Sequence, residues 1–264
     1  MLASQPILWQ IAVSHYSEKA RWALDYKGVE HQRRSPPPGL HMPVVLWLTR
    51  GRSYTLPAMD LDGRRLGDST AIIAALEERY PKPPLYPSDP VQRRRALALE
   101  DWFDEELAPY ARRLVFHELG RDRERLERSV AKSAPALYEK VGPGAVAYAR
   151  MFTKVRYGTH PEAAAERARQ RVVEGFDRLE AELGDDGYLV GGRFTVADLT
   201  AAALFYPVVM PPEAPRLLTD LPERYERFRA QVRERPGWRW VEEMFRRHRR
   251  KERASTPQDV GAAA

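Results

Sequence analysis

The sequence predicts a small α/β domain followed by a larger all-helical domain. Over about the first 80 residues, apolar runs alternate with one-sided helical patterns in the order β-α-β-(α)-β-β-α, where the helix in parentheses is a short apolar stretch at 44–48. Residues 81–90 then contain five prolines, which are typical of a domain boundary. Beyond them, apolar residues recur at helical spacing as far as residue 245. The predicted divisions are an α/β domain at 1–82, a linker at 83–90, a helical domain at 91–253 and a disordered tail at 254–264.

Each element of the first domain has a local signal. A buried apolar run predicts a strand at 7–13, and the segment after Gly28 predicts one at 29–34. An alternating run predicts a third strand at 54–61, and a fourth at 64–67 returns from an Asp62-Gly63 hairpin turn. A one-sided helix is predicted to end at Gly28, where a glycine stops the pattern. Asp68-Ser69 opens a second helix, because both residues are good N-caps.

The helical domain is predicted from stripes of apolar residues spaced three or four apart. One stripe runs from Leu99 to Leu114, and another runs from Val172 to Leu183. Thr195 and Asp198 form a variant capping box, with Asp where Glu is usual, and a helix is predicted to begin there. We assign these two residues to structure, because a capping box ties down a helix start without any ligand.

Composition narrows the classes of function. The chain has a formal charge of +6, and a run at 246–253 supplies +5 of it, so the remainder is nearly neutral. We expect this run to be a solvated helix end, which does not indicate a nucleic-acid groove. The sequence contains no cysteine, which excludes disulfides, cysteine-ligated metals and a cysteine nucleophile. The longest apolar run, 201–210, is too short for a membrane span, so we expect a soluble cytoplasmic protein with no nucleic-acid or membrane partner.

Four segments together resemble the soluble, cytosolic-type glutathione S-transferase family with a serine-type active-site motif. In order they are Ser14-His-Tyr-Ser-Glu-Lys-Ala-Arg-Trp-Ala-Leu24, Leu56-Pro57-Ala58, Asp68-Ser69-Thr70 and Phe194-Thr-Val-Ala-Asp-Leu199. Each segment alone is a weak signal, but their order and spacing match the family over residues 6–245. The resemblance implies a thioredoxin-like, glutathione-binding first domain and a transferase-type helical domain.

The resemblance makes Ser14 the predicted catalytic residue. It stands at a strand-to-helix turn, where free N–H groups and the helix dipole stabilise an anion. Its hydroxyl is expected to donate a hydrogen bond to the thiolate of bound glutathione, whose sulfur is the nucleophile. A simple N-cap is the alternative role. Tyr16 and Ser17 are rivals for the thiolate contact, although Ser17 is expected to face inward, and His15 is expected at the surface.

Leu56, Pro57, Asp68 and Ser69 are the glutathione-binding residues that the resemblance implies. The Leu56-Pro57 peptide is expected to be cis, which leaves the backbone of Leu56 to pair with the cysteinyl unit; a trans strand start is the alternative. Ser69, at a helix N-terminus, is expected to hold the γ-glutamyl carboxylate. Asp68 is expected to pair with the γ-glutamyl ammonium group, although both residues also serve as caps.

The resemblance also implies a reaction and partners. The expected protein is a homodimeric glutathione S-transferase of the detoxification type, which activates glutathione for attack on an electrophilic small molecule and needs no metal. Two alternatives stay open: a transferase fold kept as a non-catalytic binding module, and a transferase that uses another low-molecular-weight thiol. The loop before Pro57 departs from the family pattern, so the ligand of the glycine carboxylate stays open between Arg52 and His41. The sequence does not specify the electrophile.

Overall fold

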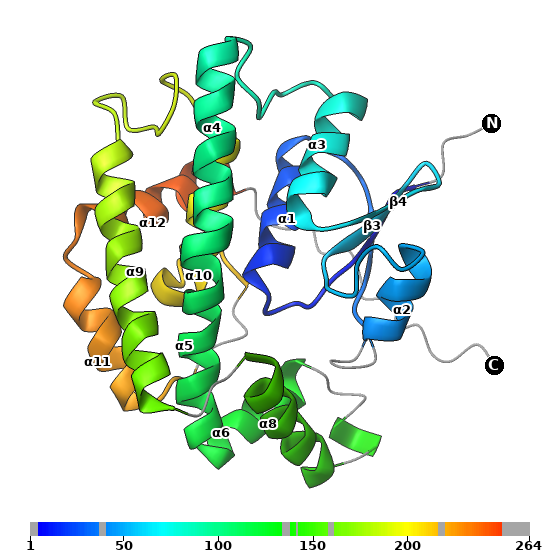
Figure 1. Cartoon of the computed structure of the whole chain (residues 1–264), viewed down its shortest axis with the longest axis vertical. Helices are drawn as coiled ribbons and strands as arrows, with labels where there is room; N and C mark the ends of the chain where they lie inside the picture. Colours follow the sequence, from blue (N-terminus) through cyan, green and yellow to red (C-terminus); the bar gives the residue numbers. More distant parts are fainter. Residues whose placement is uncertain are drawn as a thin grey trace. The chain divides into compact units, whose positions relative to one another are not determined.

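The computed structural model describes residues 5–36, 41–133, 138–140, 142–157, 161–215 and 220–249. Within these residues the chain forms two compact units (Figure 1). The first unit comprises the residues up to Pro84 together with Arg249, and the second unit runs from Leu85 to His248. The tail predicted at 254–264 lies outside the described residues.

The first unit is built on a four-stranded sheet (Figure 1). Its strands are β1 (Ile7–Trp9), β2 (Gln32–Arg34), β3 (Ala58–Leu61) and β4 (Arg64–Gly67), in the spatial order β2-β1-β3-β4. β1 pairs parallel with β2 and antiparallel with β3, and β3 pairs antiparallel with β4. A parallel pair needs a crossover, which a helix supplies, whereas the antiparallel pair closes through a tight turn.

Three helices complete this unit: α1 (His15–Tyr26), α2 (His41–Leu48) and α3 (Ser69–Arg79). α1 and α3 pack side by side (Figure 1), and Trp22 and Ile72 are fully buried. Val45 and Leu48 of α2 pack in a second apolar cluster with Trp9. The predicted α/β element order is therefore confirmed.

The strands are shorter than the sequence predicts. The apolar run suggests a strand over 7–13, but β1 ends at Trp9 and residues 10–14 form the loop into α1. Apolar residues in this loop are half-buried, so burial alone does not distinguish loop from strand. β3 likewise begins at Ala58 rather than at Tyr54, because Pro57 has no N–H to donate to a ladder.

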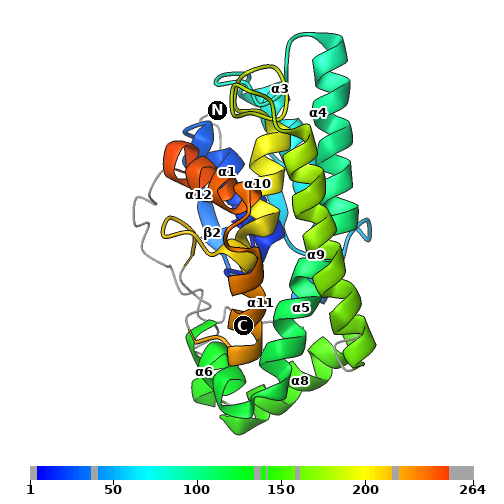
Figure 2. The ribbon, with the colours of Figure 1, turned by 90° about the vertical axis from the view of Figure 1, so that its left-hand side faces the viewer.

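The second unit is helical throughout its regular structure, as predicted. Its elements are α4 (Pro90–Trp102), a π-helical turn (Phe103–Leu107), α5 (Ala108–Arg121), α6 (Arg123–Ser133), α8 (Pro143–Tyr157), α9 (Glu162–Glu182), α10 (Val196–Val209), α11 (Glu223–Val232) and α12 (Pro236–His248). Figure 2 shows α9 running beside α5, and these helices pack together. Every residue of α10 is buried, so this helix forms the centre of the unit. Across the described ranges, no helix has the length and apolar character needed to cross a membrane.

The predicted capping box at the start of α10 is confirmed. One carboxylate oxygen of Asp198 accepts hydrogen bonds from both the N–H and the hydroxyl of Thr195, each at 2.8 Å. Its other oxygen accepts the N–H of Leu189 at 2.8 Å. Both residues are buried, and burial raises the pKa of Asp198 to about 6 against the opposing effect of these donors. The box thus ties a loop to the first turn of the central helix.

Two expectations about exposure are wrong. His15 is buried at the first position of α1, with its ring 4.5 Å from that of Tyr16. The basic run is not a uniformly solvated helix end: Arg246 and Arg247 are exposed and paired with Glu243, but Arg249 is buried. A local charge pattern does not reveal a carboxylate that a distant part of the chain supplies.

Candidate active site

The register of the sheet brings three predicted segments to the same end of the first unit. Trp9, the last residue of β1, pairs with Ala58, the first residue of β3. Ala58 in turn pairs with Gly67, the last residue of β4. The loop that carries Ser14, the Leu56-Pro57 turn and the Asp68-Ser69 helix start therefore leave neighbouring strands at a common edge. The sheet assembles the candidate site from residues far apart in the sequence.

Ser14 is the N-cap of α1, and its side chain is partly exposed. Its backbone is extended, and its hydroxyl oxygen accepts the N–H of Ser17 at 3.4 Å. Its carbonyl accepts the N–H of Glu18 at 2.9 Å, which begins the helix. The two predicted roles of Ser14, N-cap and hydrogen-bond donor to a thiolate, are compatible, because a capping hydroxyl accepts from the backbone and still has its own hydrogen to donate. This hydrogen lies at the positive end of the α1 dipole.

Ser17 and Tyr16 occupy different surroundings. Ser17 is fully buried, as expected, and its hydroxyl oxygen accepts the N–H of Ile11 at 3.2 Å. Ser17 therefore fixes the loop from inside the unit. Tyr16 is half-buried beside the ring of His15. Of the three hydroxyl residues, Ser14 and Tyr16 retain surface access.

The Leu56-Pro57 peptide is cis, as predicted. Leu56 precedes the first residue of β3, and its N–H and C=O make no backbone hydrogen bond within the described residues. The carbonyl of Pro57 accepts the N–H of Asp68 at 3.2 Å. The turn is thus joined to the start of α3, while the N–H and the C=O of Leu56 stay available for hydrogen bonding.

Asp68 caps α3 from an unusual backbone conformation. Its φ of 86° lies in the region that favours glycine, which costs an ordinary residue on the order of 1–3 kcal/mol. One carboxylate oxygen, Oδ1, accepts the N–H groups of Thr70 at 2.8 Å and Ala71 at 3.2 Å. Asp68 is exposed and Ser69 is buried. Such strain persists where surrounding contacts enforce it, and it commonly marks functional sites.

A buried lysine connects the two helix starts of this site. Lys19 of α1 donates from its ammonium group to the hydroxyl of Thr70 at 2.9 Å. Thr70 is the second residue of α3, directly after Ser69. This contact fixes the N-terminal ends of α1 and α3 relative to each other. The site therefore rests on polar contacts in addition to the sheet.

The two candidates for binding the glycine carboxylate, Arg52 and His41, differ in how exposed they are. His41 is buried at the first position of α2, whereas Arg52 is exposed in the turn that follows this helix. An exposed guanidinium keeps its donors available for an anion, which favours Arg52 as a ligand. No cluster of three or more metal-binding side chains occurs among the residues that the structure describes.

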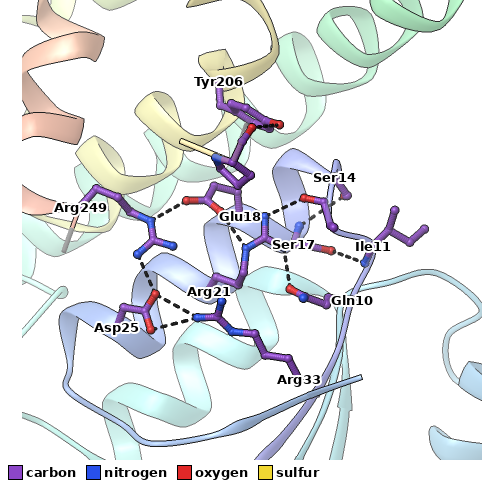
Figure 3. A network of polar contacts seen from close by, with 12 residues as sticks. Gln10, Ile11, Ser14, Ser17, Glu18, Arg21, Asp25, Arg33, Tyr206 and Arg249 are labelled. Carbon is purple, nitrogen blue, oxygen red and sulfur yellow. Dashed lines mark hydrogen bonds and ion pairs between the residues drawn. The ribbon is translucent and has the colours of Figure 1, made fainter. Parts of the chain in front are cut away.

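A buried charged pair inside α1, shown in Figure 3, has no local signal in the sequence. Glu18 and Arg21 lie one helical turn apart, and the Nε of Arg21 donates to the Oε2 of Glu18 at 2.8 Å. Both side chains are buried. Burial by itself would raise the pKa of Glu18, but the guanidinium groups of Arg249 and Arg21 hold this pKa below its ordinary value.

This depressed pKa predicts a pH dependence of stability. Because the folded pKa lies below the unfolded value, the pair stabilises fully above about pH 4.3 and loses this contribution as pH falls through the folded pKa. The difference in free energy of unfolding between wild type and Glu18→Gln is therefore expected to narrow between about pH 5 and pH 3. Urea unfolding at each pH measures it. Glu243, which is half-buried and pairs with the exposed Arg246 and Arg247, is changed to Gln as the control and should show a much smaller difference. An equal difference in free energy of unfolding at all pH values for Glu18→Gln would contradict the assignment.

Comparison with known proteins places these features in a family. The glutathione S-transferase N-terminal domain profile matches residues 8–84, and the glutathione S-transferase C-terminal domain profile matches residues 162–230. Among curated relatives, probable maleylacetoacetate isomerase 1 of Drosophila melanogaster is 31% identical over 132 residues, which are 46% of this chain and 51% of that protein. Maleylacetoacetate isomerase of Rattus norvegicus is 27% identical over 133 residues, 46% of this chain and 58% of that protein. The chain thus spans about half the length of these relatives.

Solved structures share the fold across both units. The glutathione transferase URE2P6 from Phanerochaete chrysosporium, in complex with oxidized glutathione, has a TM-score of 0.62 and 18% identity, and the match covers 92% of this chain and 91% of that one. The theta class glutathione S-transferase from Xanthomonas axonopodis pv. citri, with glutathione bound, has a TM-score of 0.56 and 22% identity, with 90% and 97% covered.

Proposed function

The chain belongs to the glutathione S-transferase family, and on this premise we propose that it is a glutathione-dependent enzyme. It binds the tripeptide at the edge of the first unit and activates its thiol for attack on an electrophilic small molecule. The observation that supports this most is the convergence of Ser14, the Leu56 peptide group and the α3 start at one sheet edge. In this proposal Ser14 donates a hydrogen bond to the thiolate, Leu56 pairs with the backbone of the tripeptide, and the start of α3 binds a carboxylate.

Each part of glutathione has a proposed ligand. The Ser14 hydroxyl donates to the sulfur, and the α1 dipole favours the thiolate over the thiol. The N–H and C=O of Leu56 pair with the cysteinyl peptide group. Ser69 holds the γ-glutamyl carboxylate at the start of α3, and Asp68 pairs with the ammonium group through Oδ2, the oxygen that its capping bonds do not use.

The reaction proposed is addition of the thiolate to an electrophilic carbon. The sulfur lone pair forms the new C–S bond. An activated alkene takes the displaced π electron pair and then a proton from solvent, whereas an aromatic acceptor expels its leaving group with the bonding pair. No metal is required, because the thiolate is generated by hydrogen bonding and the helix dipole. The curated relatives reported above are maleylacetoacetate isomerases, so maleylacetoacetate and a generic aromatic electrophile are the first acceptors to test.

The experiment that tests the function is a thermal-shift titration with glutathione. At a ligand concentration of 100 Kd, binding stabilises the protein by about 2.7 kcal/mol. S-methylglutathione is the matched control, because it keeps the peptide but has no ionisable thiol. A shift with both ligands, together with turnover of an electrophile, supports the enzyme. A shift without turnover favours the non-catalytic binding module, and no shift at millimolar glutathione favours another low-molecular-weight thiol.

A homodimer is part of the proposal, by analogy with the family, and so is a cytoplasmic location. Light scattering at micromolar concentration is expected to give twice the mass of one chain, because isologous two-fold pairs are the commonest oligomers. Dilution to nanomolar concentration serves as the control for a weak association. A particle of single-chain mass at micromolar concentration would contradict the dimer without affecting the proposed chemistry.

A further inference from the structure

Arg249 stands out because its guanidinium is buried in the first unit. It follows α12 directly in the sequence, and its side chain is 2% exposed. Its Nε donates to the Oε1 of Glu18 at 2.6 Å, and its Nη1 donates to the Oδ2 of Asp25 at 2.7 Å (Figure 3). Arg247, two residues earlier, is 48% exposed. Burying a guanidinium is costly unless it is paired, so this arginine is held by specific contacts.

The contact continues from Glu18 to the loop before Ser14. Glu18 uses its second oxygen, Oε2, to accept the Nε of Arg21 at 2.8 Å. Arg21 then donates from Nη1 to the side-chain carbonyl of Gln10 at 2.6 Å. It also donates from Nη2 to the backbone carbonyl of Ala12 at 3.1 Å. Arg21 thus bonds the loop at two residues, Gln10 and Ala12. The carboxylate that orients Arg21 is that of Glu18, which also accepts from Arg249.

The position of Ser14 depends on this loop. The N–H of Ser14 donates to the carbonyl of Ile11 at 3.0 Å, and the N–H of Ile11 donates to Ser17 at 3.2 Å. Residues 10–12 are therefore fixed by Arg21 and Ser17, and Ser14 is fixed by residue 11. A reacting group that moves by about 1 Å can lose roughly a hundredfold in rate. Accurate support of the loop therefore bears directly on a thiolate contact.

We propose that Arg249 is a positioning residue for the Ser14 turn, acting through Glu18 and Arg21. The proposal rests on the proposed function, in which Ser14 contacts the thiolate. Arginine suits this role because its rigid fork bridges two carboxylates, Glu18 and Asp25, at once. A lysine ammonium is a point charge on a flexible stem and holds such a pair less firmly. The C-terminal part of the chain thereby sets the geometry of a site near its beginning.

The first test measures the loop without any ligand. Hydrogen exchange of a peptide covering residues 10–17 is compared in wild type, Arg249→Ala and Arg249→Lys. Exchange is expected to be about tenfold faster in Arg249→Ala and intermediate in Arg249→Lys. Arg247→Ala, which removes an exposed arginine two residues away, is the matched control and should match wild type. Unchanged exchange in Arg249→Ala overturns the proposal, whatever the protein binds.

The second test measures the bound thiol. Arg249→Ala is expected to raise the pKa of enzyme-bound glutathione by about one, which lowers the thiolate fraction and kcat by up to about tenfold at a pH below this pKa. KM for glutathione should change less than twofold, and Arg249→Lys should restore part of kcat. If Arg249→Ala does not fold, Arg249→Lys takes its place, since it keeps a positive charge beside Glu18 and Asp25 and removes only the rigid fork. A melting temperature that falls while the thiol pKa stays at the wild-type value overturns the proposal.

The two tests separate this inference from the proposed function. If wild type shows no thiolate titration, the proposed function fails and the role of Arg249 toward a thiolate fails with it, while the exchange result still decides whether it holds the loop. If wild type titrates, Glu18→Gln should raise the thiol pKa as Arg249→Ala does. Arg249→Ala should then add little in the Glu18→Gln background, because both act through one path. Fully additive effects in that background overturn the proposed path.

Discussion

Replacing Ser14 by alanine is expected to slow thiol transfer about ten- to a hundredfold at neutral pH. The variant loses one hydrogen bond to a charged sulfur, which is worth about 1.5–3 kcal/mol, and this energy appears in the rate. The pKa of enzyme-bound glutathione should rise, while its affinity changes little, because the Leu56 peptide group and Ser69 still hold the tripeptide. A pH–rate profile with a generic electrophile and an ultraviolet titration of the bound thiolate measure both effects.

Three neighbouring variants provide controls with different signatures. Ser17→Ala should affect the rate less than Ser14→Ala, because Ser17 bonds the N–H of Ile11 inside the unit. Ser69→Ala should weaken glutathione binding and leave the thiol pKa unchanged. Tyr16→Phe should have little effect, since it removes a hydroxyl that the proposal does not use. If Tyr16→Phe or Ser17→Ala abolishes activity while Ser14→Ala does not, the thiolate ligand is misassigned. If none of the four variants changes the rate or the thiol pKa, the result favours the non-catalytic binding module.

The sequence predicted the elements of this site because their signals are local. The Ser14 cap and the Asp68-Ser69 helix start each lie within a few residues of the contacts they make, as does the structural Thr195–Asp198 box in the second unit. The register of the sheet, which no local pattern specifies, determines which of these segments lie side by side. The pairing of Trp9 with Ala58, and of Ala58 with Gly67, joins segments that the sequence keeps separate.

The buried charges were missed for a physical reason. Glu18 and Arg21 look like the solvated side of an amphipathic helix, because charged residues are seldom buried. The second guanidinium that pairs with Glu18 comes from Arg249, 231 positions further along the chain. His15 shows the same limit on a smaller scale, since its burial depends on tertiary packing rather than on its neighbours. Contacts of this kind appear only when the fold is known.

Replacing Asp198 by alanine is expected to lower the free energy of unfolding by about 3 kcal/mol or more. The change leaves the buried N–H groups of Leu189 and Thr195 without their acceptor, and each such loss costs about 1–3 kcal/mol. The cap of α10 is lost as well, at about 1 kcal/mol. Because α10 is buried along its whole length, water cannot replace these bonds without opening the second unit. Calorimetry should show a melting temperature lower by about 6–12 °C.

Asp89 offers the matched control for this prediction. It caps α4 with a single hydrogen bond, from the N–H of Gln92 at 2.8 Å, at an exposed position. Asp89→Ala should therefore cost only about 1 kcal/mol, because water can solvate the N–H that is released. Asp198→Asn should fall between the two, since an amide oxygen accepts from one side of the box while its NH₂ group faces the other donors. Equal losses for Asp198→Ala and Asp89→Ala would mean that the box acts as an ordinary surface cap and that burial adds nothing to it.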